Sequence, residues 1–339
     1  GTDMSEKSAP YIRVENLKKY FHTKSGMLHA VDDVSFSVQK GETLGLVGES
    51  GCGKSTLGRC IIRLLESTSG RVLITDEKGT DGYTDITKVS ASQMKELRKR
   101  VQIVFQDPYS CLNPRLPVRE LIAEPLIVNR VFRDKASMQR RVRELMSIVG
   151  LAERLENSFP HELDGGRRQR IGIARSLALD PEFIVPDEPV SALDVCIQAQ
   201  ILNLLNSLQK QFGYTYIFIS HNLSVVKHVS DRIAVMYLGK IVELSDYKIL
   251  FKDPLHPYTQ ALLSAIPIPK VGVRRDRIIL EGDVPSPIEP PEGCRFLGRC
   301  FYRQERCGRE TPELREIEPG RFVACHFARE LVAQGGRTA

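Results

Sequence analysis

The chain has 339 residues, 42% of them hydrophobic and 27% charged, and its formal net charge at pH 7 is +6. This length and composition allow a full hydrophobic core and two domains. No run of 18 or more apolar residues occurs, so the sequence predicts no membrane-spanning helix. Lys and Arg are spread along the chain, which indicates a solvated surface rather than a patch for an anionic membrane. The chain start carries no signal-peptide pattern, and we interpret residues 1–10 as a disordered remnant of protein expression.

The hydrophobic pattern divides the chain into three stretches. Residues 11–106 alternate short apolar strands with turns, whereas residues 108–162 have the period of helices, with Gly150 well placed to end one of them. Residues 163–245 return to alternating helices and strands. This order predicts an α/β core with a largely parallel sheet and a helical insertion.

A glycine-rich loop lies between an apolar strand at Thr43–Val47 and a helix predicted over Thr56–Leu65. Its sequence, Gly48-Glu-Ser-Gly-Cys-Gly-Lys-Ser55, matches every fixed position of the phosphate-binding loop of nucleotide-binding proteins. A glycine-rich turn that binds nothing would not require this whole pattern. Glycines let backbone N–H groups approach phosphate oxygens, and the helix start adds partial positive charge. We therefore predict ATP binding by Gly48, Glu49, Ser50, Gly51, Cys52, Gly53, Lys54, Ser55 and Thr56, with Lys54 on the β and γ phosphates and the Ser55 hydroxyl on Mg²⁺.

A second group of motifs lies between Phe159 and His221. A short apolar strand ends in two acids, where Asp187 suits the Mg²⁺ shell and Glu188 suits polarising the attacking water. Each motif alone has an ordinary explanation as a solvated turn or a loop residue. The other motifs of this group are Leu163-Asp-Gly-Gly-Arg167, Ser191-Ala-Leu-Asp194 and Ser220-His221.

In this motif order the chain resembles the ATP-binding-cassette (ABC) ATPases over about residues 11–265. The resemblance implies a P-loop NTPase fold of the α/β class, with a RecA-like core, an antiparallel β part and a helical arm at about residues 108–162. It also implies an adenine-stacking aromatic, either Phe21 or its neighbour Tyr20. It assigns catalytic roles to Lys54, Gln106, Glu188 and His221, Mg²⁺ ligation to Ser55, Gln106 and Asp187, the signature motif to Asp164, Gly165, Gly166 and Arg167, and the D-loop to Ser191, Ala192, Leu193 and Asp194.

Two departures from the family pattern fall where chemistry is expected. The signature usually has serine where this chain has Asp164, and an ionised carboxylate there would repel the γ-phosphate of a partner's ATP. Arg167, where glutamine is usual, could neutralise it as a charge-assisted pair. The alternative is a weakened composite site. Pro186 removes a hydrogen-bond donor from a central strand, so we expect it to be the last residue of that strand.

The C-terminal part of the chain narrows the family. Residues 256–267 resemble the extension of ATPase subunits of oligopeptide and dipeptide importers, although alone they would also fit an ordinary proline-bounded helix. We expect residues 266–339 to form a small extension that is rich in cysteine. Because an ATPase works in a reducing compartment, a disulfide framework is not expected. Four cysteines fall in this extension: Cys294, Cys300, Cys307 and Cys325. Four thiolates suit Zn²⁺ or a [4Fe–4S] cluster, and both the wide gaps between the cysteines and the family resemblance favour the cluster. Free or structural thiols are a further alternative.

The resemblance implies an ATPase that powers import of dipeptides or oligopeptides at the cytoplasmic face of the cell membrane. Its implied partners are a second ABC ATPase subunit in a head-to-tail dimer, two integral membrane permease subunits and, indirectly, an extracytoplasmic peptide-binding protein. Two alternatives are an ATPase of a nickel or other small-solute importer and a soluble ABC ATPase that acts on nucleic acid. The second of these usually carries two cassettes or a long coiled-coil insertion, and this chain has neither, so we expect no nucleic-acid partner.

Overall fold

The computed structural model describes residues 9–76, 82–266, 277–328 and 330, so most of the predicted N-terminal remnant lies outside the described residues. Contacts divide the chain into two compact units. The first contains residues 1–39, 43–88 and 220–339, and the second contains residues 40–42 and 89–219. None of the helices that the structure describes combines the length and apolar character needed to cross a bilayer.

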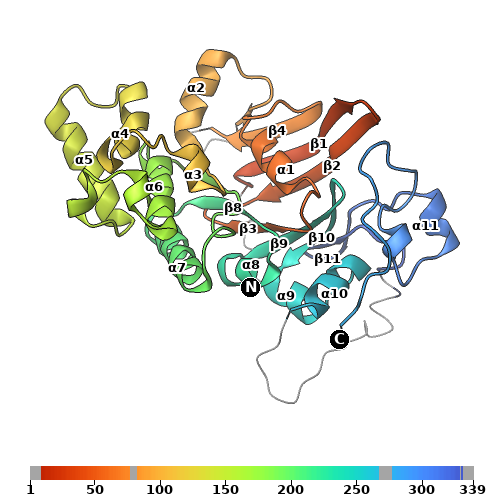
Figure 1. Ribbon diagram of the computed structural model, residues 1–339. Coiled ribbons are helices and arrows are strands. Elements are labelled where there is room, and N and C mark those ends of the chain that lie inside the picture. Colours follow the sequence, from red (N-terminus) through yellow and green to blue (C-terminus); the bar gives the residue numbers. More distant parts are fainter. Residues whose placement is uncertain (1–8, 77–81, 267–276, 329, 331–339) are drawn as a thin grey trace, which may run out of the picture. The chain divides into compact units, whose positions relative to one another are not determined.

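The first unit contains an antiparallel sheet of order β2-β1-β4-β5. Strands β1 and β2 form a hairpin whose register runs from Ile12 opposite Val38 to Thr23 opposite Gly26. Alternate residues of β1 are buried near its start, because successive side chains of a strand point to opposite faces. Figure 1 shows the hairpin as two long arrows beside β4. The strands are β1 (Ile12–Thr23), β2 (Gly26–Val38), β4 (Ser69–Thr75) and β5 (Tyr83–Asp85).

The same unit holds a second run of strands, in the order β11-β12-β10-β9-β3. Strand β3 pairs with β9 in parallel, and the other neighbours pair antiparallel. All five residues of β3 are buried, which explains its continuous apolar sequence. The elements are β3 (Thr43–Val47), α1 (Lys54–Ile61), α8 (Leu223–Val229), β9 (Arg232–Tyr237), β10 (Lys240–Asp246), α9 (Tyr247–Lys252), α10 (Pro257–Ser264), η3 (Leu297–Arg299), α11 (Glu305–Arg309), β11 (Arg315–Glu318) and β12 (Arg321–Val323).

The second unit has three strands in the order β8-β7-β6, with both pairs parallel. Between the end of β6 and the start of β7 the described chain is helical, which confirms the helical character expected of residues 108–162, and α4, α5 and α6 lie side by side (Figure 1). The elements are α2 (Ala91–Arg100), β6 (Val101–Val104), α3 (Pro108–Cys111), α4 (Val118–Val128), α5 (Lys135–Ile148), η1 (Glu153–Leu155), η2 (Pro160–Glu162), α6 (Gly165–Leu177), β7 (Phe183–Pro186), α7 (Val195–Phe212) and β8 (Thr215–Ser220).

Several predicted ends of helices and strands can be compared with the structure residue by residue. Pro186 is the last residue of β7, and Gly150 follows α5 with φ of 73°, so both predictions are confirmed. The helix predicted to reach Leu65 stops at Ile61, because the chain turns at Arg63, whose φ is +52°. Residues 11–106, for which we predicted strands, turns and the helix after the glycine-rich loop, also contain α2, which Ser90 caps through a reciprocal capping box.

Candidate active site

The phosphate-binding loop joins the buried strand β3 to helix α1, as its sequence predicts. Gly53 has φ of 103°, and a Cβ there would lie 2.0 Å from the carbonyl oxygen of Ala30. A Cβ on Gly48 would lie 2.2 Å from the carbonyl oxygen of Met236. Real Cβ atoms do not approach backbone oxygens so closely, so these glycines are required by the packing of the loop as well as by its conformation.

The ammonium group of Lys54 is held by its own loop. Its Nζ donates to the carbonyl oxygens of Gly48 at 2.9 Å and Glu49 at 3.1 Å, and the side chain is 4% exposed. A buried cation needs such partners to offset its desolvation. Neutral carbonyl dipoles compensate a cation less strongly than phosphate oxygens do, so the site is suited to exchanging these contacts for an anion. Ser55 follows Lys54 in the first turn of α1.

The two aromatic candidates for adenine stacking differ in their surroundings. The hydroxyl of Tyr20 donates to Asp32 at 2.5 Å, and its ring stacks on His29 with centroids 4.0 Å apart. Burial and this hydrogen bond to Asp32 raise the pKa of Tyr20. Phe21 pairs with Leu28 across the hairpin and carries Lys19 Nζ 4.8 Å from its ring centroid. Because adjacent strand residues face opposite ways, the Tyr20 interactions leave Phe21 on the other face of β1.

The predicted metal ligand and base lie together where β7 ends. Asp187 is 3% exposed, and its backbone N–H donates to Val104 at 2.9 Å. Glu188 has φ of 49°, a left-handed conformation that non-glycine residues seldom adopt, and its N–H donates to Ile219 at 2.9 Å. Strained backbone of this kind clusters at functional sites. Gln106 is exposed and follows β6, the strand next to β7, so the second unit brings Gln106, Asp187 and Glu188 to the same ends of parallel strands.

The predicted signature motif forms the start of helix α6. Asp164 is its N-cap and accepts from the backbone N–H of Arg167 at 2.8 Å, while Arg167 Nη1 lies 3.4 Å from Asp164 Oδ2. The expected pairing of these two residues is therefore present within one motif. A Cβ on Gly166 would lie 2.6 Å from Ile197 Cγ2, so the glycine lets α6 approach the start of α7. The D-loop ends at Asp194, which caps α7 by accepting from the Ile197 N–H at 3.1 Å, so the structure brings signature motif and D-loop together.

His221 is exposed in the loop that follows β8 and belongs to the first unit. The first unit thus carries the phosphate loop, the aromatic pair and His221, and the second unit carries Gln106, the acidic pair and the predicted signature motif and D-loop.

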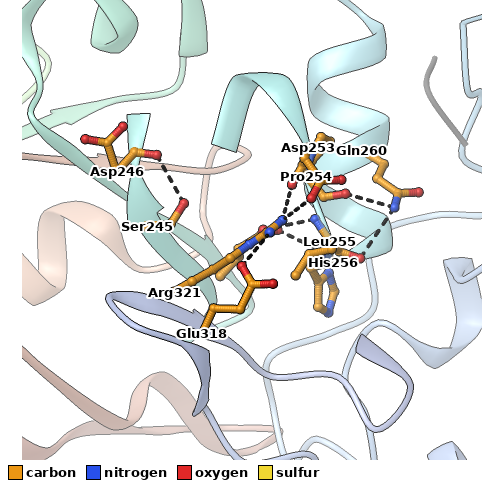
Figure 2. Close-up of polar contacts among 10 residues, drawn as sticks. Ser245, Asp246, Asp253, Pro254, Leu255, His256, Gln260, Glu318 and Arg321 are labelled. Atoms are coloured by element: carbon orange, nitrogen blue, oxygen red, sulfur yellow. Dashed lines mark hydrogen bonds and ion pairs between the residues drawn. The ribbon is translucent and has the colours of Figure 1, made fainter. Parts of the chain in front are cut away.

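A buried polar cluster supports the segment that follows β10. The carboxylate of Glu243 accepts from the N–H groups of Leu255 at 3.0 Å and His256 at 2.9 Å. His256 Nδ1 in turn accepts from the Tyr258 N–H at 3.1 Å and caps α10. Arg321 of β12 reaches Asp253 at 3.0 Å and Glu318 at 3.2 Å (Figure 2). These contacts fix the C-terminal hairpin β11–β12 to the chain between β10 and α10.

The four C-terminal cysteines share one neighbourhood. Burial, with a smaller contribution from the neighbouring thiols, raises the pKa of Cys294 to about 11 and that of Cys300 to about 12. Across the described ranges, however, no three His, Cys, Asp or Glu side chains form a group that could hold a metal ion. The prediction that Cys294, Cys300, Cys307 and Cys325 bind a metal is therefore not supported by this arrangement. The spacing of the four cysteines in the sequence does not determine how their sulfur atoms are arranged in the fold.

The sequence prediction missed one set of residues at the phosphate loop. Arg299 Nη1 lies 2.8 Å from Glu49 Oε2, and the hydroxyl of Tyr258 accepts from the Glu49 N–H at 2.8 Å. Both partners are more than 200 positions away in the chain. No local pattern could have paired them.

Two family models match separate parts of the chain. One, described as ABC transporter, matches residues 31–191, and the other, described as the C-terminal region of oligopeptide/dipeptide transporters, matches residues 242–307. The first match spans the phosphate loop, the signature and the acidic pair. The second spans α10 and three of the four C-terminal cysteines.

Close relatives cover almost the whole chain. It is 50% identical over 326 residues to the oligopeptide transport ATP-binding protein AppF of Bacillus subtilis, covering 93% of this chain and 97% of the relative. It is also 50% identical over 316 residues to the oligopeptide transport ATP-binding protein OppF of Haemophilus influenzae, covering 93% of each chain.

Solved structures show the same fold. A dimeric ATP-binding cassette, MJ0796 in a post-hydrolysis state bound to ADP and Pi, aligns with a TM-score of 0.62 at 28% identity over 70% of this chain and 98% of that chain. The cbiO1 protein of Clostridium perfringens, part of an ABC transporter complex, aligns with a TM-score of 0.63 at 27% identity over 72% of this chain and 91% of that chain.

Proposed function

Because this chain belongs to the family of ABC ATPases of oligopeptide and dipeptide transporters, we propose that it hydrolyses ATP to drive peptide import through a membrane permease. It is an ATPase coupled to transport, and its relatives are named for oligopeptide transport. The single observation that carries the assignment is the presence of the phosphate loop and the transporter C-terminal region in one chain. In that loop, Lys54 is buried and bound by neutral carbonyl oxygens, which phosphate oxygens can replace.

The proposed roles follow from side-chain chemistry. Lys54 would bind the β and γ phosphates, and Phe21 rather than Tyr20 would stack on adenine, because the Tyr20 hydroxyl is bound to Asp32. Mg²⁺ prefers oxygen ligands, and the Ser55 hydroxyl, the Gln106 amide and the Asp187 carboxylate supply them. When bound, Mg²⁺ would offset charge on the phosphates.

Glu188 is the proposed general base. Its carboxylate would orient the attacking water and accept a proton as the water oxygen bonds to the γ-phosphorus, while His221 would hold the γ-phosphate. We expect Glu188→Gln to retain ATP binding and to lose at least about 100-fold in steady-state turnover, the usual contribution of a general base. Glu96→Gln, on the exposed face of α2, is the matched control and should turn over ATP normally. Full turnover by Glu188→Gln would remove this residue from the mechanism.

The proposed assembly is a head-to-tail dimer with a second ABC ATPase, identical or not, in which Asp164 to Arg167 of each subunit face the partner's γ-phosphate. Two permease subunits would dock near Gln106 and the helical arm, and an extracytoplasmic peptide-binding protein would deliver substrate. The chain would therefore lie at the cytoplasmic face of the membrane. Support comes from the dimeric cassette that it resembles and from the importer relatives. Co-purification with permeases from membranes tests the assembly.

The two alternative functions are not favoured. The relatives described above are named for oligopeptide transport, which does not point to nickel or to nucleic acid. Within the importer class, uptake assays with labelled peptides against Ni²⁺ would separate the first alternative from peptide import.

We also propose that the C-terminal cysteines bind a [4Fe–4S] cluster, with Zn²⁺ as the alternative. The support is that Cys300 lies within electrostatic reach of the other three thiols, those of Cys294, Cys307 and Cys325. The thiols would have to adopt a tighter arrangement than the one described, which has no metal-ligand group. Anaerobic purification with iron, acid-labile sulfide and zinc analysis is the test. Near-equal iron and sulfide would support the cluster, zinc would support the alternative, and neither would leave four ordinary thiols.

A further inference from the structure

The phosphate loop is bound from outside by the cysteine-rich segment of the same unit. Arg299 and Glu49 form a two-pronged ion pair, with Nη1 to Oε2 at 2.8 Å and Nη2 to Oε1 at 3.2 Å. The side chain of Arg299 is 10% exposed and that of Glu49 is 29% exposed. A forked guanidinium–carboxylate pair of this kind fixes orientation as well as charge. The contact therefore sets where the Glu49 side chain lies.

Three groups of Glu49, its carboxylate, its N–H and its carbonyl oxygen, each have a hydrogen-bond partner. Arg299 binds its carboxylate, the hydroxyl of Tyr258 accepts from its N–H at 2.8 Å, and Lys54 Nζ donates to its carbonyl oxygen at 3.1 Å. Arg299 and Tyr258 belong to the C-terminal part of the chain, whereas Lys54 is the phosphate-binding lysine. One loop residue thus connects the C-terminal part to the ammonium that binds nucleotide.

The segment that carries Arg299 is itself anchored in the core. Phe296 is 1% exposed, and its ring packs edge-on to Tyr237 with centroids 5.2 Å apart and against Tyr258 at 5.5 Å. Arg295 pairs with Asp32 and donates to the carbonyl oxygen of Leu238. Phe296 and Arg295 lie three and four positions before Arg299. The backbone that carries the Arg299 guanidinium is therefore fixed, unlike a free chain end.

The charges explain what this contact does for the site. A carboxylate in a loop that must bind a polyphosphate repels its ligand, and the repulsion is long-ranged where water is excluded. Arg299 neutralises that carboxylate and holds it by both oxygens, while the loop carbonyls remain with Lys54. We propose that Arg299 is a positioning residue for ATP binding, which acts through Glu49 and makes the C-terminal segment part of the phosphate-binding machinery.

This inference rests on ATP binding by the phosphate loop, and it predicts a dependence on one partner. In the chain with Glu49, Arg299→Gln should raise the Kd for a slowly hydrolysed ATP analogue at least about tenfold at low salt, the effect of one lost positive charge at about 10 Å and an effective dielectric constant of about 20. A loss should persist at 0.5 M salt, because the released Glu49 carboxylate is no longer held away from the phosphates. In the Glu49→Gln chain, Arg299→Gln removes the same positive charge, so an electrostatic loss remains at low salt. At 0.5 M salt, where that charge is screened, the change should alter Kd less than about twofold, because no carboxylate is left to position.

The experiment is a titration of the four full-length chains with a fluorescent ATP analogue, at low and at 0.5 M salt. Arg306→Gln is the matched control, because Arg306 lies in the same extension but pairs with the exposed Glu310 at 2.8 Å, and its Kd should stay within about twofold of wild type. Equal losses at 0.5 M salt with and without the Glu49 carboxylate would mean a role of Arg299 that does not act through Glu49, and no loss in either chain would mean no role, so both outcomes overturn the inference. If wild type itself failed to bind the analogue, the proposed ATPase function would fail instead.

Discussion

Acid should unfold this protein partly through one buried imidazole. His256 is 2% exposed, and its Nδ1 is occupied in accepting from the Tyr258 N–H, so the folded chain holds the ring neutral. Burial lowers its pKa from 6.5 to about 3. Between these two values the unfolded chain binds the proton and the folded chain does not, so the free energy of unfolding falls as pH falls.

The size of the effect follows from the same two values. At pH 4.5 the unfolded ring is protonated and the folded ring is still neutral, so the loss between pH 7 and pH 4.5 is about 2.5 kcal/mol at about 1.4 kcal/mol per pH unit. Glu243, which accepts from the His256 N–H, has its pKa raised by burial. It therefore acts with the opposite sign, since the stability that it contributes is lost as pH rises above 4.5.

Urea unfolding of wild type and His256→Asn at pH 7 and pH 4.5 isolates the imidazole, because Glu243 and the other titrating groups are common to both chains. Asn can still cap α10 but cannot take up a proton. The wild-type drop in unfolding free energy should exceed that of the variant by about 2.5 kcal/mol. His22→Asn, which changes an exposed ring on β1, should keep the wild-type drop. Equal drops in wild type and His256→Asn would refute a neutral buried His256.

Three further substitutions test packing around the site. Gly53→Ala should weaken ATP binding by more than about 100-fold, because its Cβ would lie 2.0 Å from a backbone oxygen, and a nucleotide titration measures this. Arg321→Met should lower the unfolding free energy by about 2 kcal/mol. This is less than the loss for a fully buried ion pair, because Asp253 and Glu318 can rehydrate. Urea unfolding measures the change, with Arg306→Met as the exposed control. Asp164→Ala should cost about 1 kcal/mol of stability through the lost N-cap, whereas Asp164→Ser should cost almost none, as the thermal midpoints of both variants would show.

How far the sequence predicted the structure depended on the range of each interaction. The strand Thr43–Val47, the end of β7 at Pro186 and the pairing of Asp164 with Arg167 rest on neighbours within a few positions, and local rules suffice for them. The early end of α1 depends on the left-handed backbone conformation of Arg63, and arginine has no preference for that conformation from which it could be predicted. The contact of Arg299 with Glu49 joins residues 250 positions apart, so only the folded chain reveals it.

The aspartate in the predicted signature motif meets the needs of a helix start. Serine and aspartate are both good N-caps, because each offers a side-chain oxygen to the free N–H groups of the first turn. Asp164 uses this capacity on the Arg167 N–H, so replacement of the usual serine preserves the start of α6. The carboxylate adds a negative charge that serine lacks, and the Arg167 guanidinium lies 3.4 Å from its second oxygen. Capping therefore permits aspartate at this position, whereas compensation of its charge by Arg167 at a partner's phosphate stays a prediction, with a weakened composite site as the alternative.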